Sequence, residues 1–241
     1  MIFLIIFLFF SLTNHVNSHH KIYSPVVEEG RHSLEWRGHL DVDDRDSKNK
    51  AHHHVLETEY SWTDFWQSEI ELHLSDKEET PFDWEKTEFQ NQLQILDFNN
   101  FNAALYFSYN FVSEGEEADE IEYKYLNQFT NRHLSLISNF IFEKQVGATA
   151  TGSTTFSLSN SLMYKDLFIK DFDVGFFGFS DLGNITKFNT LSEQKHQYGL
   201  QFESEFELSS IEYEFSFGYL HGLTDSTANH TLVWNIEVEL D

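Results

Sequence analysis

The chain has 241 residues and a formal net charge of −25 at neutral pH, with 40 Asp and Glu against 15 Lys and Arg. This acidity argues against nucleic acid as a partner, because phosphates need a basic surface, and against docking on anionic lipid through basic side chains. Cysteine is absent and proline occurs twice, whereas phenylalanine occurs 25 times. Proline cannot donate to a strand ladder, so its scarcity favours long paired strands, and no disulfide is available to hold an exported fold.

The chain begins with an uncharged apolar run, Met-Ile-Phe-Leu-Ile-Ile-Phe-Leu-Phe-Phe-Ser-Leu. The run is too short to span a bilayer as a helix and is typical of the core of a secretory signal. We therefore expect residues 1–18 to be a signal peptide, cleaved after Val16-Asn17-Ser18, and residues 19–241 to be one mature domain. A short membrane anchor is the alternative reading of the run, and either reading predicts export.

A polar lead-in, residues 19–30, precedes a series of segments in which apolar and polar residues alternate. In the first of them, Leu34 and Trp36 share one face and Glu35 and Arg37 the other, which is the period of a strand. Strands are expected at about residues 33–42, 54–60, 69–74, 88–95, 102–111, 121–126, 134–142, 155–164, 170–179, 196–205, 211–219 and 232–240.

The last two segments show the pattern most clearly. Phe215 and Phe217 alternate with Glu212 and Glu214, and the following segment alternates in the same way around Trp234. Two adjacent runs of period two predict an antiparallel pair that is apolar on one side and polar on the other. The aromatic character of the apolar side favours a membrane β-barrel hairpin with that side toward lipid.

The connections also alternate in kind. Those after the odd-numbered strands are long or charged, for example residues 43–51, 75–82 and 181–195, whereas those after the even-numbered strands are short. Short periplasmic turns and longer outer loops are typical of outer-membrane barrels. The expected fold class is therefore all-β, a transmembrane antiparallel up-and-down β-barrel of about 12 strands in the outer membrane, with both termini in the periplasm.

Four short stretches give the chain a resemblance to small Gram-negative, porin-like outer-membrane barrel proteins, most of them uncharacterised. They are Pro25-Val26-Val27-Glu28-Glu29-Gly30, Leu34-Glu35-Trp36-Arg37-Gly38, Thr63-Asp64-Phe65-Trp66 and Gly218-Tyr219-Leu220-His221-Gly222-Leu223-Thr224-Asp225. The resemblance runs through most of the mature chain and implies an outer-membrane location. It implies no activity, because the stretches carry no chemistry.

The polar face of the strands supplies the candidate functional residues. A lumen biased toward carboxylates favours cations, and a barrel of about 12 strands lies between side-chain-filled and open-channel sizes, which predicts a narrow or occluded pore. The alternative is a hydrated carboxylate network that only stabilises the wall. The candidate pore-lining residues are Glu35, Arg37, Glu57, Glu59, Glu69, Glu71, Glu122, Lys124, Glu212, Glu214 and Glu237.

The sequence offers residues for two other kinds of site, a metal site and the active site of a lipid-modifying enzyme. His52-His53-His54 follow an acidic loop, and imidazole with carboxylate suits Zn, Cu or Ni, but consecutive residues in a strand point in different directions. No metal site or cofactor is therefore expected. A lipid-modifying enzyme of the outer membrane needs a serine within reach of an oriented histidine, and no Gly-x-Ser-x-Gly motif marks one. The expected partners are outer-membrane lipid, the barrel-assembly machinery and small cations or solutes.

Overall fold

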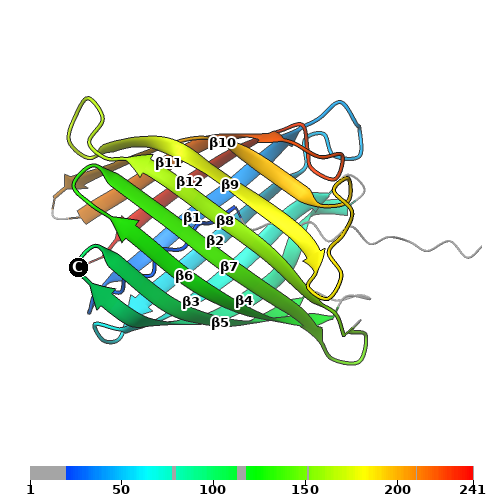
Figure 1. The fold of residues 1–241 in the computed structure, drawn as a ribbon, viewed down its shortest axis with the longest axis horizontal. Coiled ribbons are helices and arrows are strands. Elements are labelled where there is room, and N and C mark those ends of the chain that lie inside the picture. Colours follow the sequence, from blue (N-terminus) through cyan, green and yellow to red (C-terminus); the bar gives the residue numbers. More distant parts are fainter. Residues whose placement is uncertain (1–19, 78–79, 113–117, 151, 210, 241) are drawn as a thin grey trace, which may run out of the picture.

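A computed structural model describes residues 20–240 except residues 78–79, 113–117, 151 and 210, so the expected signal peptide lies outside the described residues. Twelve antiparallel strands form a closed barrel, in which each strand pairs with the next and β12 pairs with β1 (Figure 1). This confirms the expected all-β barrel. The strands are β1 His32–Val42, β2 His52–Ser61, β3 Trp66–Lys77, β4 Thr80–Phe98, β5 Phe101–Val112, β6 Asp119–Thr130, β7 Leu134–Val146, β8 Thr154–Tyr164, β9 Phe172–Asn184, β10 Lys195–Leu208, β11 Ile211–Gly222 and β12 His230–Glu239.

The two ends of the barrel differ. One end, the turn end, holds the connections after the even-numbered strands together with the start of β1 and the end of β12, where the Leu240 N–H donates to the His32 carbonyl at 2.6 Å. The other end, the loop end, holds the connections after the odd-numbered strands. Among the described residues, no helix has the length and apolar character needed to cross a membrane.

The prediction of a charged loop at residues 75–82 is wrong. β3 continues to Lys77 and β4 begins at Thr80, so most of this segment is an extension of the hairpin, with register shifts after His73 and Ser75. A hairpin that projects beyond the bilayer has water on both faces and needs no apolar alternation. The charged composition of this segment therefore concealed the pairing.

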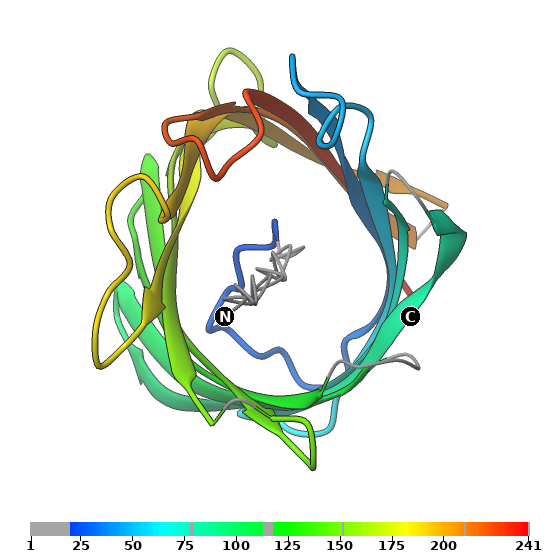
Figure 2. The same ribbon diagram turned by 90° about the vertical axis from the view of Figure 1, so that its right-hand side faces the viewer.

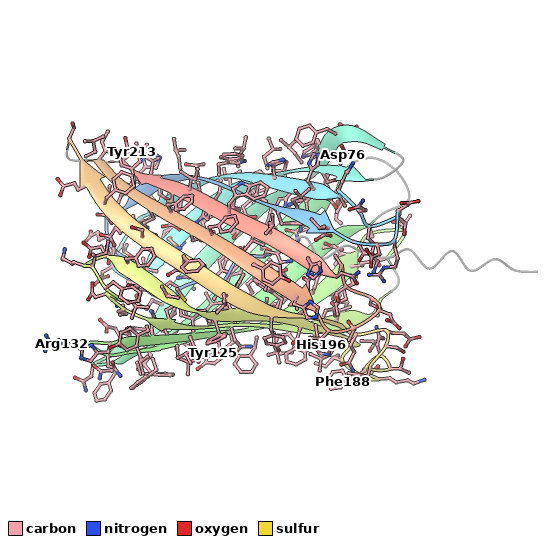
Figure 3. All side chains as sticks on the ribbon, turned by 90° about the horizontal axis from the view of Figure 1, so that it is seen from above. Asp76, Tyr125, Arg132, Phe188, His196 and Tyr213 are labelled. Atoms are coloured by element: carbon pink, nitrogen blue, oxygen red, sulfur yellow. The ribbon has the colours of Figure 1, made fainter. Side chains whose placement is uncertain are left out.

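The outer wall of the barrel is apolar and the inner wall is polar. Phe107 is 39 % exposed and Phe215 44 % exposed on the outside, whereas Tyr106 and Ser108, the neighbours of Phe107 in sequence, are buried inside. Side chains project outward from the strands around the barrel (Figure 3). A closed barrel leaves no unpaired strand edge, and an apolar outer wall matches the interior of a bilayer.

A charge on the middle of this wall should destabilise the barrel more than the same charge near its end. Phe107 lies halfway along β5 and Phe111 lies near the loop end of the same strand. We expect Phe107→Arg to lower the free energy of unfolding by about 2–4 kcal/mol and Phe111→Arg by about 0–1 kcal/mol, because the cost of a lipid-facing cation falls toward the interface. Urea unfolding in phospholipid vesicles, followed by tryptophan fluorescence, measures both. Equal small costs would contradict a lipid-facing wall.

Candidate functional site: the lumen

The lumen of the barrel contains part of the chain itself. Residues 20–30, which we call the lumenal segment, precede β1 and lie inside the ring of strands (Figure 2). The Tyr23 backbone N–H donates to Asn139 Oδ1 at 2.8 Å, and Asn139 Nδ2 donates back to the Tyr23 carbonyl at 2.9 Å. Nearer the turn end, Gln92 and Gln94 of β4 bond the backbone of Ser24 and Val27. The segment is therefore held along the wall by hydrogen bonds to its backbone.

Two consecutive residues of the lumenal segment reach opposite walls. The Tyr23 side chain packs in a buried cluster with Ala104, Tyr106 and Leu126, on β5 and β6. The Ile22 side chain packs against a second cluster, which consists of Phe177, Leu220 and Val233 on β9, β11 and β12. Successive side chains of an extended chain point in opposite directions, so this pair spans the lumen. The segment consequently narrows the barrel at the level of residues 22–23.

Seven successive strands carry a row of glutamates on the inner wall, and each of the six strand pairs brings two of them directly opposite one another. Around the barrel from β10 through β12 and β1 to β4, this glutamate row consists of Glu205, Glu214, Glu237, Glu35, Glu57, Glu71 and Glu88. Like charges directly opposite one another destabilise a strand pair. The row therefore needs cations, either from the chain or from solution.

Arg37 supplies the largest share of that compensation. Its Nη1 lies 2.5 Å from Glu35 and also contacts Glu57, and its Nη2 lies 2.6 Å from Glu71. All four side chains are at most 8 % exposed. A charge buried in this way is stable only while its partners are present.

The lumenal segment and Arg31 beside it supply further cations to the row. Lys21 Nζ lies 2.7 Å from Glu57 and 3.3 Å from Glu35. Arg31 Nη2 lies 2.9 Å from Glu237 and 3.2 Å from Glu214. The residues that precede the first strand thus neutralise part of the acidic wall that follows them.

The candidate pore-lining residues fall into two groups by burial. Glu35, Arg37, Glu57, Glu69, Glu71, Glu122 and Lys124 are buried on the inner wall. Glu59, Glu212, Glu214 and Glu237 are half-buried nearer the turn end. Glu122 and Lys124 form a separate pair at 2.6 Å, with Lys124 Nζ 3.7 Å from the centre of the Tyr23 ring, so the lumenal segment covers this pair too.

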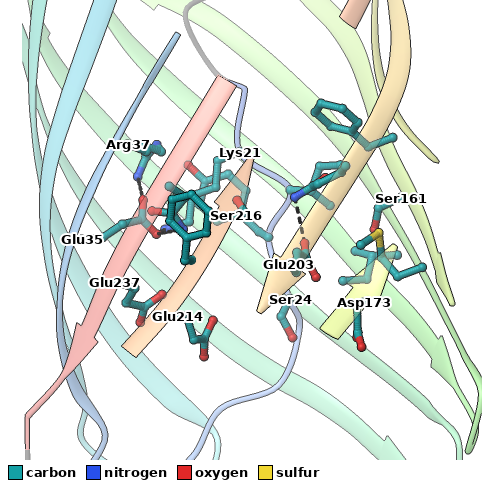
Figure 4. A pocket seen from close by; sticks show the side chains of 18 of the residues that line it. Lys21, Ser24, Glu35, Arg37, Ser161, Asp173, Glu203, Glu214, Ser216 and Glu237 are labelled. Atoms are coloured by element: carbon teal, nitrogen blue, oxygen red, sulfur yellow. Dashed lines mark hydrogen bonds and ion pairs between the residues drawn. The ribbon is translucent and has the colours of Figure 1, made fainter. Parts of the chain in front are cut away.

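A cavity of about 720 Å³ lies beside the lumenal segment (Figure 4). Of the candidates, Glu35, Arg37, Glu59, Glu69, Glu214 and Glu237 line it, whereas Glu57, Glu71, Glu122, Lys124 and Glu212 do not. Eleven of its lining side chains are carboxylates and five are Lys or Arg. Three of these carboxylates, Glu203, Asp173 and Glu205, lie on the β9–β10 side of the lumen, away from the Arg37 cluster. The cavity therefore carries a net negative charge.

Several charged or titratable residues of the lumen are absent from the candidate pore-lining residues. Lys21 and Arg31 precede the first strand, where no alternation indicates a direction, so no signal could have placed them inside. His39 and His73, in contrast, share the inward register of Glu35 and Glu71, and the period of two places them on the polar face, although they are not among the candidate pore-lining residues. The lumen is less acidic than the candidate list suggests.

The three consecutive histidines lie on opposite faces of β2. His53 is buried in the lumen, whereas His52 and His54 lie outside with their rings 5.4 Å apart. His54 also accepts a hydrogen bond at 3.3 Å from Nε1 of the outward-facing Trp36. These residues therefore do not converge on one ion.

A serine and a histidine meet on the outer wall near the loop end, where Figure 3 labels His196. His196 Nδ1 lies 3.0 Å from Ser180 Oγ, and His196 Nε2 lies 2.8 Å from Gln194 Oε1. Because Gln194 Nε2 donates to the Asn189 carbonyl at 2.8 Å, its oxygen faces the ring, and His196 must carry its proton on Nε2. The Nδ1 lone pair then faces the Ser180 hydroxyl. Tyr198 Oη, 2.6 Å from Ser180 Oγ, completes the group.

Comparisons with known proteins bear on the fold. No family model matches the chain, and no curated protein matches it. A NanC porin structure aligns with a TM-score of 0.59 at 12 % identity, over 86 % of this chain and 99 % of the porin. A KdgM porin aligns with a TM-score of 0.56 at 11 % identity, over 87 % and 98 %. A KdgM porin in complex with disordered oligogalacturonate aligns with a TM-score of 0.55 at 12 % identity, over the same shares.

At sequence identities of 11–12 %, these alignments show similarity of fold alone. The chain has the closed barrel of these porins over nearly their whole length, which confirms the expected resemblance to small porin-like barrels at that level.

Proposed function

We propose that the protein is a passive outer-membrane pore that favours small cations and is narrowed by its own lumenal segment. The observation that carries the proposal is the acidic cavity of about 720 Å³ inside a closed barrel with an apolar outer wall. A space lined by one sign of charge between low-dielectric walls concentrates ions of the opposite sign. The porin-like fold supports a passive pore.

The charge of the cavity also bears on the class of solute. Oligogalacturonate, present in one KdgM porin structure, is a chain of carboxylate sugars. The cavity of this chain presents eleven carboxylates, which would repel such a polyanion. Small cations or neutral solutes fit the proposal better.

The proposal includes an orientation. Outer-membrane barrels have short turns in the periplasm and longer loops outside. The start of β1 and the end of β12 lie together at the turn end, which supports a periplasmic position for the two ends of the barrel sheet. A signal peptide at residues 1–18, removed to give a mature chain of residues 19–241, and insertion by the barrel-assembly machinery into outer-membrane lipid belong to the same proposal.

Ion selectivity tests the proposal directly. In planar bilayers with a KCl gradient, we expect a reversal potential on the cation side, because the cavity is acidic. The triple variant Glu59→Gln, Glu203→Gln, Glu214→Gln should move that potential toward zero. Asp44→Asn, which removes one charge in the exposed β1–β2 loop, is the control and should leave it nearly unchanged. Anion preference, or a triple variant with unchanged selectivity, contradicts the proposal.

The arrangement of Ser180, His196 and Gln194 favours a second candidate function, hydrolysis of a lipid acyl ester at the outer wall. Ser180 Oγ would attack the ester carbonyl carbon while His196 Nδ1 takes the hydroxyl proton, and His196 would return that proton to the departing alcohol. Water then cleaves the acyl-serine by the reverse proton transfers, and the Tyr198 hydroxyl can donate to the developing oxyanion.

Covalent labelling separates this candidate from the pore. A fluorophosphonate probe should label the purified protein, and both labelling and release of fatty acid from phospholipid vesicles should be lost in Ser180→Ala and in His196→Ala. Ser68→Ala is the matched control, because Ser68 also lies on the outer wall but bonds Trp62 and Asn91 instead of a histidine. Labelling that persists in Ser180→Ala rules the candidate out.

A further inference from the structure

Four histidines lie in a file inside the lumen, each from a different element. They are His20 of the lumenal segment, His39 of β1, His53 of β2 and His73 of β3. His20 Nδ1 lies 3.2 Å from His39 Nδ1, the rings of His39 and His53 stack with centres 5.6 Å apart, and His53 Nε2 lies 3.3 Å from His73 Nδ1. Neither the acidic cavity nor the proposed pore accounts for this arrangement.

The proton on His20 is fixed by a chain of hydrogen bonds. The Asp41 carboxylate accepts from the Thr231 hydroxyl at 2.5 Å, and Thr231 Oγ1 accepts from Gln197 Nε2 at 3.0 Å. The Gln197 oxygen must then face His20 Nε2, 3.1 Å away, so Nε2 carries the proton. His20 Nδ1 is left with a lone pair, and this lone pair faces His39.

The separation of the two Nδ1 atoms matches the edge of a metal site. Zinc binds histidine nitrogen at about 2.0–2.1 Å, so two nitrogens of a tetrahedral site lie roughly 3.3 Å apart. Without a metal, a proton on His39 Nδ1 can bridge the pair. With a metal, that proton moves to His39 Nε2 and both imidazoles stay neutral, as ligation requires.

The His20–His39 pair suits an ion better than the His53–His73 pair. His20 and His39 line the cavity, which gives an ion a path in and leaves room for water ligands. His73 is fully buried, its Nε2 lies 2.7 Å from Glu71, and that carboxylate already binds Arg37. An ion bound at His53–His73 would therefore compete with Arg37 for the Glu71 carboxylate, whereas the ring of His53 stacks on that of His39 beside the cavity.

We propose that His20 and His39 bind one divalent transition-metal ion through their Nδ1 atoms. The class is the borderline ions Ni²⁺, Cu²⁺ and Zn²⁺, which imidazole suits. Gln197 is a positioning residue, because it orients the His20 ring and fixes its proton, as carboxylates and amides do behind metal-binding histidines. The ion would join the lumenal segment to β1 independently of whether the barrel conducts.

Cu²⁺ is the probe, since it binds nitrogen ligands most tightly among these ions. Titration of the detergent-purified protein, followed by calorimetry and electron paramagnetic resonance, should show one saturable site with nitrogen coordination. His20→Ala and His39→Ala should each weaken binding at least tenfold, and Gln197→Leu by about 10–100-fold. His20 lies outside the strands, so His20→Ala leaves the strand ladder intact, and heat-modifiable gel migration verifies the fold of each variant.

The matched control is the double variant His221→Ala, His230→Ala. It removes an exposed histidine pair on β11 and β12 whose ring centres lie 5.4 Å apart. Binding should be unchanged in this variant. Loss of the site in the control, with retention in His20→Ala and His39→Ala, would identify an adventitious surface ion only and overturn the proposal. Unchanged coordination in Gln197→Leu would remove the positioning role of Gln197.

Discussion

Deleting residues 20–30 should raise the single-channel conductance of the barrel several-fold. Ile22 and Tyr23 pack against opposite walls, so their removal takes away the contacts that span the lumen. An interior of 12 strands is wider than the side-chain-filled interior of eight strands, so the emptied barrel should hold continuous water. The deletion also removes Lys21 from Glu35 and Glu57, so the reversal potential in a KCl gradient should move further to the cation side.

Glu29→Gln is the control for this deletion. Glu29 lies on the same segment but is exposed, so its substitution should leave the conductance nearly unchanged. Conductance that stays the same after the deletion would show that the segment does not set the constriction. If neither the intact nor the shortened protein conducts, the barrel is a structural one, and the pore is excluded.

Arg37→Met should destabilise the barrel strongly. Arg37 contacts Glu35, Glu57 and Glu71 in a buried cluster, and the substitution removes the one cation that all three carboxylates share. Removing one partner of a buried ion pair costs about 3–5 kcal/mol. We expect a loss of this size in the free energy of unfolding, measured by urea titration in vesicles, or a failure of the chain to assemble.

Two further variants test the cause of that loss. Adding Glu57→Gln and Glu71→Gln to Arg37→Met should restore part of the stability, because the unpaired charges are then removed. Lys170→Met, which breaks an exposed pair with Asp171 at 2.8 Å, should cost about 0–1 kcal/mol. A loss below about 1 kcal/mol for Arg37→Met would mean that water or mobile ions replace its contacts.

The strands could be predicted from sequence because lipid and lumen impose a period of two. Phe215 and Phe217 alternate with Glu214 and Ser216, and the structure places them on opposite walls. The predicted strands fall within or close to the observed ones, which are mostly longer. The alternation of apolar and polar residues weakens where a strand extends beyond the bilayer. The end of β3 and the start of β4 therefore resemble a loop in the sequence.

The contents of the lumen could not be predicted in the same way. The Tyr23 backbone N–H donates to Asn139, which lies 116 residues away in the sequence, and no local pattern around Tyr23 predicts that contact. The structure places the glutamates of the row on the inner wall, but their pairing depends on cross-strand register and on a segment without alternation. The charge balance of the interior is therefore a tertiary property, whereas the direction of each strand residue is a local one.

The pairing of β1 with β12, which closes the barrel, bears on the order of folding events. Glu35 and Glu237 meet there face to face, and Lys21 and Arg31, from residues upstream of β1, lie against the same two carboxylates. If β1 paired with β12 first, Lys21 and Arg31 would have to reach these carboxylates afterwards through an end of the closed barrel. We therefore expect the lumenal segment to enter the barrel before β1 pairs with β12. The variant without residues 20–30 should therefore close its barrel slowly at low ionic strength. Added salt should restore the rate of closure, because dissolved cations then screen the glutamates in place of Lys21.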